Sequence, residues 1–147
     1  MTKHQRLTGT LDVALPPDEA FALFTPRGEE EWVDGWQPHF PVDPIDDTEP
    51  GTVFETHAHG DDTIWVVVSR ETGRRISYAR VTPGSRAGTV TVELEPTAQG
   101  SRVTVGYELT ALSDAGQVGL VEFAAMYPEF LRSWETAIEQ WRTARAG

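Results

Sequence analysis

The sequence has 147 residues, with 23 acidic against 12 basic side chains, a formal net charge of −11 and no cysteine. This length predicts one domain, residues 1–147, that is large enough to bury a hydrophobic core. The acidic charge argues against nucleic acid or an anionic membrane surface as a partner, because both require a basic face. The lack of cysteine excludes disulfide bonds and a thiol nucleophile.

Neither the N-terminus nor the longest apolar run indicates a membrane or secretory signal. Residues 1–10 are polar and contain no apolar region of the kind that a signal peptide needs. The longest uninterrupted apolar run, 64–68, is far shorter than the roughly 20 residues of a membrane-spanning helix. We therefore expect a cytoplasmic protein with no membrane partner. The sequence leaves monomer and homodimer open as alternatives.

The chain opens with alternating apolar and polar residues over 4–15, which predicts a first strand. Two prolines end this strand, and Pro17 suits the first position of a helix. Asp18 and Glu19 follow, where a helix N-terminus favours negative charge. We therefore expect a short helix that ends at Pro26.

A second short helix is expected over 26–33, with Glu29, Glu30 and Glu31 exposed to solvent. The next segment, 35–51, contains four prolines and shows no clear period. A segment of this length without a period is often a functional loop. The apolar residues of this segment are compatible with a short edge strand.

Five further strands are expected from alternating patterns that short turns separate; they cover residues 52–58, 63–70, 74–82, 87–95 and 101–112. Short turns between neighbouring strands predict antiparallel pairing. Between residues 63 and 68 both alternating sets are apolar, so the pattern does not show on which face Trp65 and Val67 lie.

Residues 113–145 predict one long amphipathic helix. Its large apolar residues recur at spacings of three and four; they are Leu120, Phe123, Tyr127, Phe130, Leu131, Trp134, Ile138 and Trp141. Ser113 suits the N-cap, and Pro128 is expected to bend the helix. Trp134, Ile138 and Trp141 are expected in the core, whereas the aromatic residues near Pro128 fill the core or line a ligand cavity.

Four short segments carry a resemblance to a known superfamily. They are Pro-Pro-Asp-Glu-Ala-Phe at 16–21, Gly-Thr-Val-Phe at 51–54, Arg-Ile-Ser-Tyr at 75–78 and Arg-Val-Thr-Val at 102–105. With the order of the elements, they resemble the START/Bet v 1-like (SRPBCC) superfamily, in its polyketide cyclase/dehydrase-like or AHSA1-like branch. The resemblance implies an α+β helix-grip fold. In that fold a curved antiparallel sheet of six to seven strands wraps around a long C-terminal helix, and two short helices follow the first strand.

The resemblance also implies a cavity between the concave side of the sheet and the last helix. Members of the superfamily include lipid carriers, hormone receptors, aromatic cyclases and Hsp90 co-chaperones, so the fold does not decide the activity. We expect the protein to bind a small hydrophobic molecule, such as an aromatic or polyketide-like one, for carriage or sensing. One alternative is a metal-free cyclase or dehydratase that acts on such a ligand. Another is an AHSA1-like co-chaperone or interaction protein.

The expected ligand-binding residues are Trp32, Trp36, Phe54, Trp65, Tyr78, Arg80, Tyr107, Phe123, Met126, Tyr127 and Phe130. Trp32 and Trp36 line the entrance or pack the short helices onto the sheet. If Tyr78 points inward, Arg80 does so too, because side chains two apart on a strand share a face. A buried arginine needs an anionic partner, which is a neighbouring glutamate or a carboxylate or phenolate of the ligand. Arg80 and Tyr78 are also the candidate catalytic pair for acid–base work on a bound ketone.

His57 and His59 form the strongest alternative motif, because two imidazoles two residues apart on a strand share a face. A metal site of this kind needs further ligands downstream, and His59 is the last histidine of the chain. We therefore expect no metal. No glycine-rich loop of the kind that cradles phosphate occurs in a strand–helix context, so no cofactor is expected.

Overall fold

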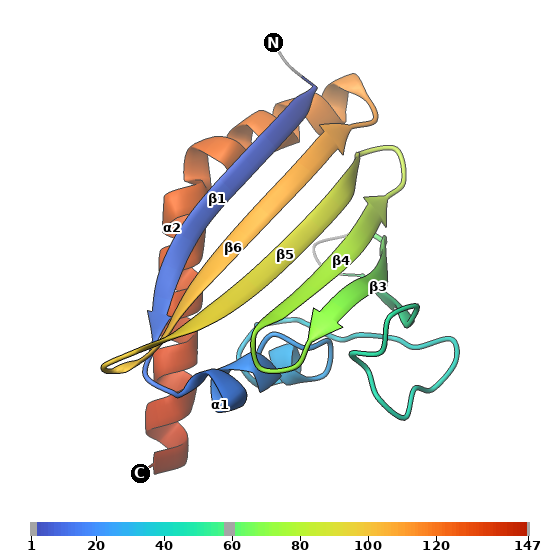
Figure 1. Ribbon diagram of the computed structural model, residues 1–147. Helices are drawn as coiled ribbons and strands as arrows, with labels where there is room; N and C mark the ends of the chain where they lie inside the picture. Colours follow the sequence, from blue (N-terminus) through green and yellow to red (C-terminus); the bar gives the residue numbers. More distant parts are fainter. Residues whose placement is uncertain (1–2, 58–60, 147) are drawn as a thin grey trace.

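The computed structural model describes residues 3–57 and 61–146 as a curved sheet, two short helices and one long helix (Figure 1). The strands are β1 (His4–Val13), β2 (Val53–Thr56), β3 (Thr63–Glu71), β4 (Arg75–Thr82), β5 (Arg86–Thr97) and β6 (Gly100–Ala111). The helices are α1 (Pro17–Ala22), the 3₁₀ helix η1 (Gly28–Glu31) and α2 (Asp114–Ala146). The order of elements and the α+β class predicted from the sequence are confirmed.

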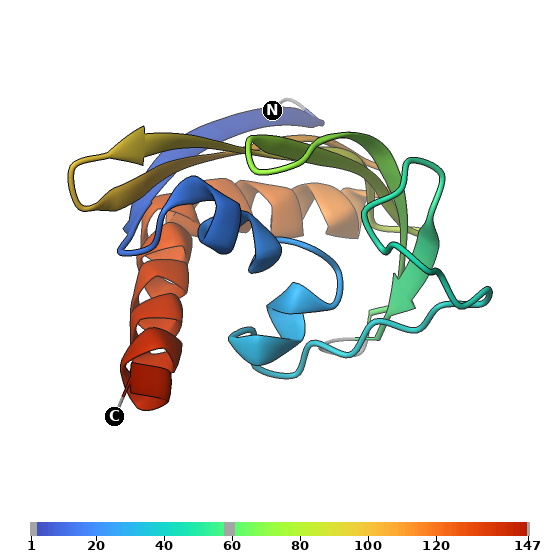
Figure 2. The same cartoon turned by 60° about the horizontal axis from the view of Figure 1, so that its bottom comes forward.

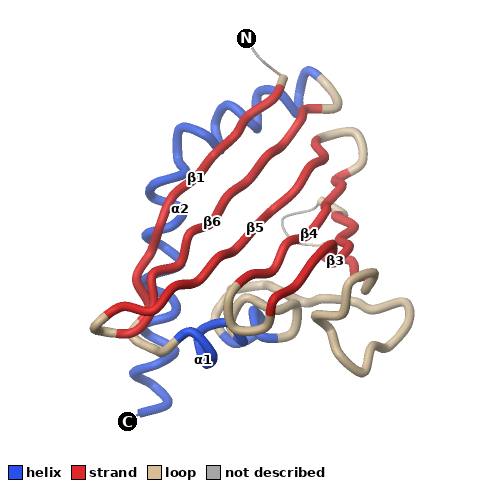
Figure 3. The backbone as a smooth tube through the Cα atoms, viewed as in Figure 1, coloured by secondary structure: helices blue, strands red, loops and turns tan. Residues whose placement is uncertain are grey.

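The six strands form a single sheet in the order β1-β6-β5-β4-β3-β2, and every neighbouring pair is antiparallel (Figure 3). The first strand therefore pairs with the last one, while short turns join the other neighbours. Figure 2 shows that the sheet curls over α2 on one side and over α1 and η1 on the other. This arrangement is the helix-grip fold.

Strand register decides which side chains face the concave side of the sheet. Phe54 pairs with Trp65, and Trp65 pairs with Arg80, so these three side chains form one row. Val67 pairs with Tyr78 in the next inner row. Trp65 and Val67 are buried, whereas Ile64 and Val68 on the opposite face are exposed. Pairing with neighbouring strands therefore resolves the ambiguity that the apolar run 64–68 leaves in the sequence.

The long helix α2 is capped and bent as its sequence predicts. The Ser113 hydroxyl accepts a hydrogen bond of 3.0 Å from the Gly116 N–H group. Pro128 lies inside the helix, where its ring removes the hydrogen bond to the Ala124 carbonyl. Figure 2 shows that α2 changes direction in its middle, so that its two halves run at an angle to each other. No helix in the described part of the chain carries a stretch long and apolar enough to cross a bilayer.

Gly9 lets α2 approach β1 closely near the bend. A Cβ atom at this position would lie 2.5 Å from Cδ1 of Leu131, which is buried and cannot move away. We expect Gly9→Ala to lower the free energy of unfolding by about 1–3 kcal/mol, because overpacking forces a shift in the core. Urea denaturation measures this loss. Gly106→Ala on the adjacent β6 is the control, since a Cβ there meets only ordinary contacts. Equal stability of the two variants would contradict the close approach.

The segment 35–51 between η1 and β2 forms no strand; its one ladder contact is an isolated bridge between His39 and Glu55. Ion pairs hold the loop instead. The Arg27 guanidinium lies 2.7 Å from the Asp43 carboxylate, and that of Arg70 lies 2.5 Å from Asp46. The prolines remove backbone donors and so prevent regular pairing along the edge of β2.

Candidate functional site

A pocket with a volume of about 310 Å³ lies between η1, the inner face of the sheet and α2. It is lined by Glu29, Val33, Asp34, Trp36, Thr56, Asp61, Thr63, Trp65, Arg80, Thr82, Ser85, Arg86, Tyr107, Phe130 and Trp134. The lining therefore combines an aromatic wall with a few charged and hydroxyl groups. This combination is typical of small-molecule sites, where apolar walls supply contact area and a few polar groups orient the ligand.

Two tryptophans of the aromatic wall have their indole N–H groups engaged within the protein. The Trp36 indole N–H donates to the Pro26 carbonyl at 2.7 Å, and that of Trp65 donates to the Thr56 hydroxyl at 3.0 Å. Phe54 stacks behind Trp65 with a centroid separation of 5.7 Å and an interplanar angle of 2°. Because the indole N–H groups already have partners, the rings offer apolar surface to a ligand.

Arg80 brings a positive charge into this aromatic surrounding. Its guanidinium carbon lies 4.9 Å from the centroid of Trp65, and its Nη2 donates to the Thr82 hydroxyl at 3.0 Å. Its Nε is enclosed and has no hydrogen-bond partner among the described residues. Burial lowers the pKa of Arg80, while Tyr107 and Asp61 partly offset this effect. The guanidinium nevertheless stays charged. Arg80 thus points inward, as its spacing from Tyr78 predicts, and carries an unused donor.

The three tyrosines of the sequence differ in what their hydroxyl groups do. The Tyr78 hydroxyl donates to the Phe24 carbonyl at 2.7 Å, and that of Tyr127 donates to the Val105 carbonyl at 2.6 Å. The Tyr107 hydroxyl makes no hydrogen bond to a described residue, and Tyr107 lines the pocket. Burial raises the pKa of Tyr107, although Arg80 acts in the opposite direction. Tyr107 therefore carries a protonated hydroxyl that a ligand can use.

Glu29 lines the pocket, which corrects the prediction that all three glutamates of η1 are exposed. η1 is a 3₁₀ helix whose residues point in directions that the α-helical period does not give. The Glu29 carboxylate forms no hydrogen bond or ion pair with a described residue, and burial raises its pKa well above its usual value. A carboxyl group in this state is neutral over a wider pH range than an exposed one.

A second arginine, Arg86, lines the pocket from the start of β5. Gly119 of α2 makes room for it, because a Cβ atom there would lie 2.7 Å from Nη2 of Arg86. Ser85 is accommodated in the same way, since a Cβ at Gly116 would lie 2.0 Å from its carbonyl oxygen. Like Arg80, Arg86 forms no ion pair with a carboxylate in the described part of the chain. The carboxyl groups of Glu29, Asp34 and Asp61 line the same pocket, and Asp61 acts on Arg80 through space, but none of them forms an ion pair with either arginine. Two arginines without an ion-pair partner favour an anionic ligand group.

The remaining predicted ligand-binding residues surround the pocket without lining it. Trp32 and Phe54 are buried, and the Trp32 indole N–H donates to the Leu23 carbonyl at 2.7 Å. Phe123 and Tyr127 pack edge-on against Tyr107, with centroids at 5.2 and 5.8 Å. These side chains hold the lining residues in place.

Met126 lies on the outer side of α2, with 53% of its side chain exposed. Met126 lies about one turn before Phe130 but is not among the residues that line the pocket. Met126 is therefore not part of the site, although its spacing on the helix made it a candidate.

The histidine motif lies at the end of β2, next to the pocket residue Thr56. The His57 Nδ1 lies 2.6 Å from the Asp62 carboxylate, and this bond raises the pKa of His57. His59 lies outside the described residues. The described part of the chain holds no group of three or more potential metal ligands.

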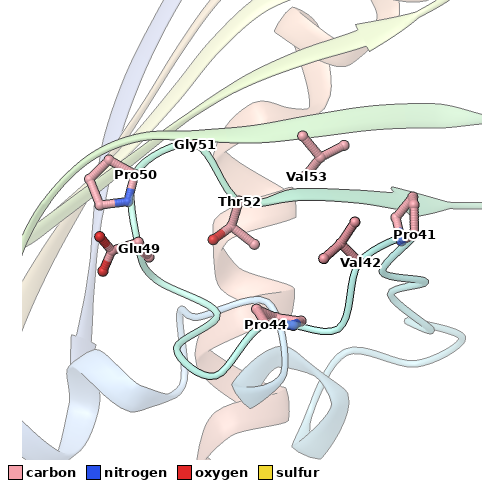
Figure 4. A pocket seen from close by; sticks show the side chains of 8 residues that line it. All are labelled: Pro41, Val42, Pro44, Glu49, Pro50, Gly51, Thr52 and Val53. Atoms are coloured by element: carbon pink, nitrogen blue, oxygen red, sulfur yellow. The ribbon is translucent and has the colours of Figure 1, made fainter.

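A larger hollow, of about 550 Å³, lies beside the loop that precedes β2 (Figure 4). Proline and valine side chains make up most of its wall, and Glu49 is its one ionisable residue. The Glu49 carboxylate lies 3.7 Å from the Arg70 guanidinium and is therefore already engaged. This hollow offers mainly apolar surface and no unpaired charge, so we take the pocket under the sheet as the candidate site.

Several lining residues are not among the ligand-binding candidates that the sequence offers. They are Glu29, Asp34, Asp61, Arg86, the three threonines Thr56, Thr63 and Thr82, and Trp134, which the sequence predicts only as a core residue. Thr63 and Thr82 share a hydrogen bond of 2.7 Å across two strands, so register brings them together. Thr82 follows Arg80 by two residues on β4, so the two-residue period of the strand predicts that Thr82 shares the inner face with Tyr78 and Arg80.

Fold and site together define a START/Bet v 1-like protein with a pocket under its sheet. Residues 4–139 match the family described as polyketide cyclase / dehydrase and lipid transport, so the chain belongs to this family. The match selects the first of the two branches that the sequence resembles. Among curated proteins, no sequence matches this one.

Solved structures with the same fold have low sequence identity to this chain. The protein MLL2253 from Mesorhizobium loti is 20% identical, with a TM-score of 0.65 over 92% of this chain and 98% of its own. A protein from Rhizobium leguminosarum is 14% identical, with a TM-score of 0.67 over 93% and 95%. DynU16, from the dynemicin biosynthetic locus, is 19% identical, with a TM-score of 0.63 over 95% of this chain and 48% of its own. At these identities the similarity establishes the fold alone.

Proposed function

We propose that the protein binds a small, mostly apolar molecule that carries an acidic oxygen, in the pocket between η1, the sheet and α2. The observation that supports this proposal most directly is Arg80, which lines the pocket, stacks on Trp65 and forms no ion pair with a described carboxylate. A largely buried charge without an ion-pair partner is costly, so a ligand that brings an anionic group to it gains affinity. Carriage or sensing of such a molecule is the activity that these contacts support best.

The aromatic wall sets the shape of the ligand. Trp36 and Trp65 meet at a centroid separation of 5.6 Å and an interplanar angle of 69°, and Phe130 and Trp134 contact each other at 5.1 Å. Flat ring systems can stack on one member of each pair and meet the edge of the other. We therefore expect the body of the ligand to be aromatic or polyketide-like, with a carboxylate or phenolate toward Arg80.

Titration calorimetry with 2-naphthoic acid and 2-naphthamide tests the proposal, because the two compounds share a shape and differ in charge. We expect the acid to bind at least about 10-fold more tightly, since hydrogen bonds to charged groups contribute roughly 1.5–3 kcal/mol. Added salt should reduce the difference in affinity between the two compounds only in part, because the pocket shields the charge from dissolved ions. Equal affinity of the two compounds, or binding of neither, would contradict the proposal.

A second candidate function is catalysis of the polyketide cyclase/dehydratase type on such a ligand. The free Tyr107 hydroxyl favours it, since a protonated phenol and a guanidinium then lie in the same pocket. Asp61, which lines the same pocket, would take the α-proton of a ketone of the ligand, Arg80 would stabilise the enolate oxygen that forms, and Tyr107 would protonate that oxygen to give the enol. Tyr78, the other candidate from the sequence, has its hydroxyl engaged with the Phe24 carbonyl. Tyr107 is therefore the tyrosine to which we assign this role.

A further inference from the structure

The polar groups of the pocket fall on two facing walls. Arg80 and Arg86 extend from β4 and β5, while Glu29 extends from η1. Figure 2 shows that η1 faces the concave side of the sheet. In the described structure the Glu29 carboxyl forms no ion pair with either arginine. A ligand that spans the pocket thus meets cations at one end and a carboxyl group at the other.

The surroundings of the Glu29 carboxyl favour its protonated form. Burial is the cause of its raised pKa, and no cation reverses that effect. The charged or titratable groups that face it are Asp34 and Asp61 from the loops, and Arg80, Arg86, Tyr78 and Tyr107 from the sheet. From α2 only Phe130 and Trp134 reach the pocket. In its protonated form, the Glu29 carboxyl can donate a hydrogen bond as well as accept one.

We propose that Glu29 donates a hydrogen bond to a neutral carbonyl oxygen of the ligand, so that the pocket selects aromatic keto acids. This inference rests on the proposed function and adds the second recognition element. The acidic group of the ligand lies at Arg80, and the ketone lies at Glu29. A neutral hydrogen bond between a carboxyl O–H and a ketone needs no counter-ion, which suits a site where Glu29 has none.

The matched probes are 6-acetyl-2-naphthoic acid and 6-ethyl-2-naphthoic acid, which differ in one carbonyl oxygen. At pH 6 we expect the acetyl compound to bind roughly 3- to 10-fold more tightly, which is the contribution of one neutral hydrogen bond. The preference should fall as the pH rises and Glu29 loses its proton. Glu29→Gln keeps an N–H donor and should show the preference at every pH. Glu29→Leu should bind both acids equally.

Glu30→Gln is the control, because Glu30 is exposed on the same short helix and does not line this pocket. Glu30→Gln should show the same preference for the acetyl compound, with the same pH dependence, as the unchanged protein. Thermal unfolding of each variant reports whether it folds, and it also reports the ionisation of Glu29. Because Glu29 binds a proton more tightly in the folded chain, its contribution to stability is present at acid pH and is lost as the pH rises. Glu29→Gln should therefore gain stability over the unchanged protein only toward neutral pH.

The possible outcomes separate this inference from the proposed function. Binding of both acids with equal affinity, or an unchanged preference in Glu29→Leu, would overturn the role of Glu29 and leave the acid-binding pocket intact. A preference in Glu29→Gln that still depends on pH would also overturn it. Binding of neither acid would overturn the proposed function itself.

Discussion

Arg80→Met is expected to weaken the binding of 2-naphthoic acid about 10- to 100-fold, which is the loss of a charged hydrogen bond inside the pocket. A methionine side chain packs beside Trp65 in a similar volume but has no hydrogen-bond donor. The affinity for the neutral 2-naphthamide should change little. Titration calorimetry of both compounds against both proteins gives the four constants that separate charge from shape.

The fold should tolerate this change. The Arg80 Nε has no partner to lose, and no carboxylate in the described structure forms an ion pair with the guanidinium. Removing a buried charge that lacks a counter-ion does not leave another charge unpaired. We therefore expect a melting temperature equal to or above that of the unchanged protein.

Arg74→Met provides the matched control for Arg80→Met, because it removes the same charge from an exposed position outside the pocket. It should leave both affinities as they are. Acid binding that survives in Arg80→Met, or that falls equally in Arg74→Met, would show that Arg80 does not hold the acidic group.

Phe54→Ala is expected to lower the free energy of unfolding by about 3–5 kcal/mol, the usual loss for a fully buried phenylalanine. Phe54 is 1% exposed. It stacks on Trp65, meets Tyr78 edge-on at 6.1 Å and contacts Phe40 at 5.7 Å. Its removal leaves a cavity behind the aromatic wall of the pocket. For a chain of this length the loss corresponds to a fall in melting temperature of roughly 10 °C.

Val53→Ala tests the same strand from its other face. Val53 is 40% exposed and is paired with Val66 on the outer side of the sheet. Most surface substitutions change stability by about 0.5 kcal/mol or less, so the two neighbouring variants should differ several-fold. Denaturation in urea measures both. A comparable loss in the two variants would mean that Phe54 does not anchor the inner face.

Local periodicity accounts for the parts of the site that the sequence predicts. The two-residue period of β4 turns Arg80 to the same side as Tyr78, and the spacing of apolar residues in α2 directs Phe130 toward the sheet. Tyr107 lines the pocket for the same reason as Arg80, since the signal lies within one strand, where side-chain direction repeats. Trp65 lies on the inner face because of its pairing with neighbouring strands, and Trp36 lies in the loop after η1.

The role of each hydroxyl and carboxyl group depends instead on which distant segment lies opposite. The Tyr78 hydroxyl is engaged because the Phe24 carbonyl, 54 residues earlier in the chain, lies 2.7 Å away. Arg86 enters the pocket because Gly119 of α2 leaves space for it. The periodicity of one strand or helix does not predict that the Phe24 carbonyl lies beside Tyr78 or that Gly119 lies beside Arg86.

By itself, the sequence of this protein determines the order of its strands and helices, the capped and bent final helix, and the inward direction of Arg80. These features follow from the 3.6- and two-residue repeats and from the missing N–H group of Pro128. Only the tertiary structure decides that Glu29 lines the pocket, that Tyr107 rather than Tyr78 has a free hydroxyl, and that neither arginine forms an ion pair with a described carboxylate. Burial and hydrogen-bond pairing are properties of segments brought together from distant parts of the chain, and no local pattern encodes them.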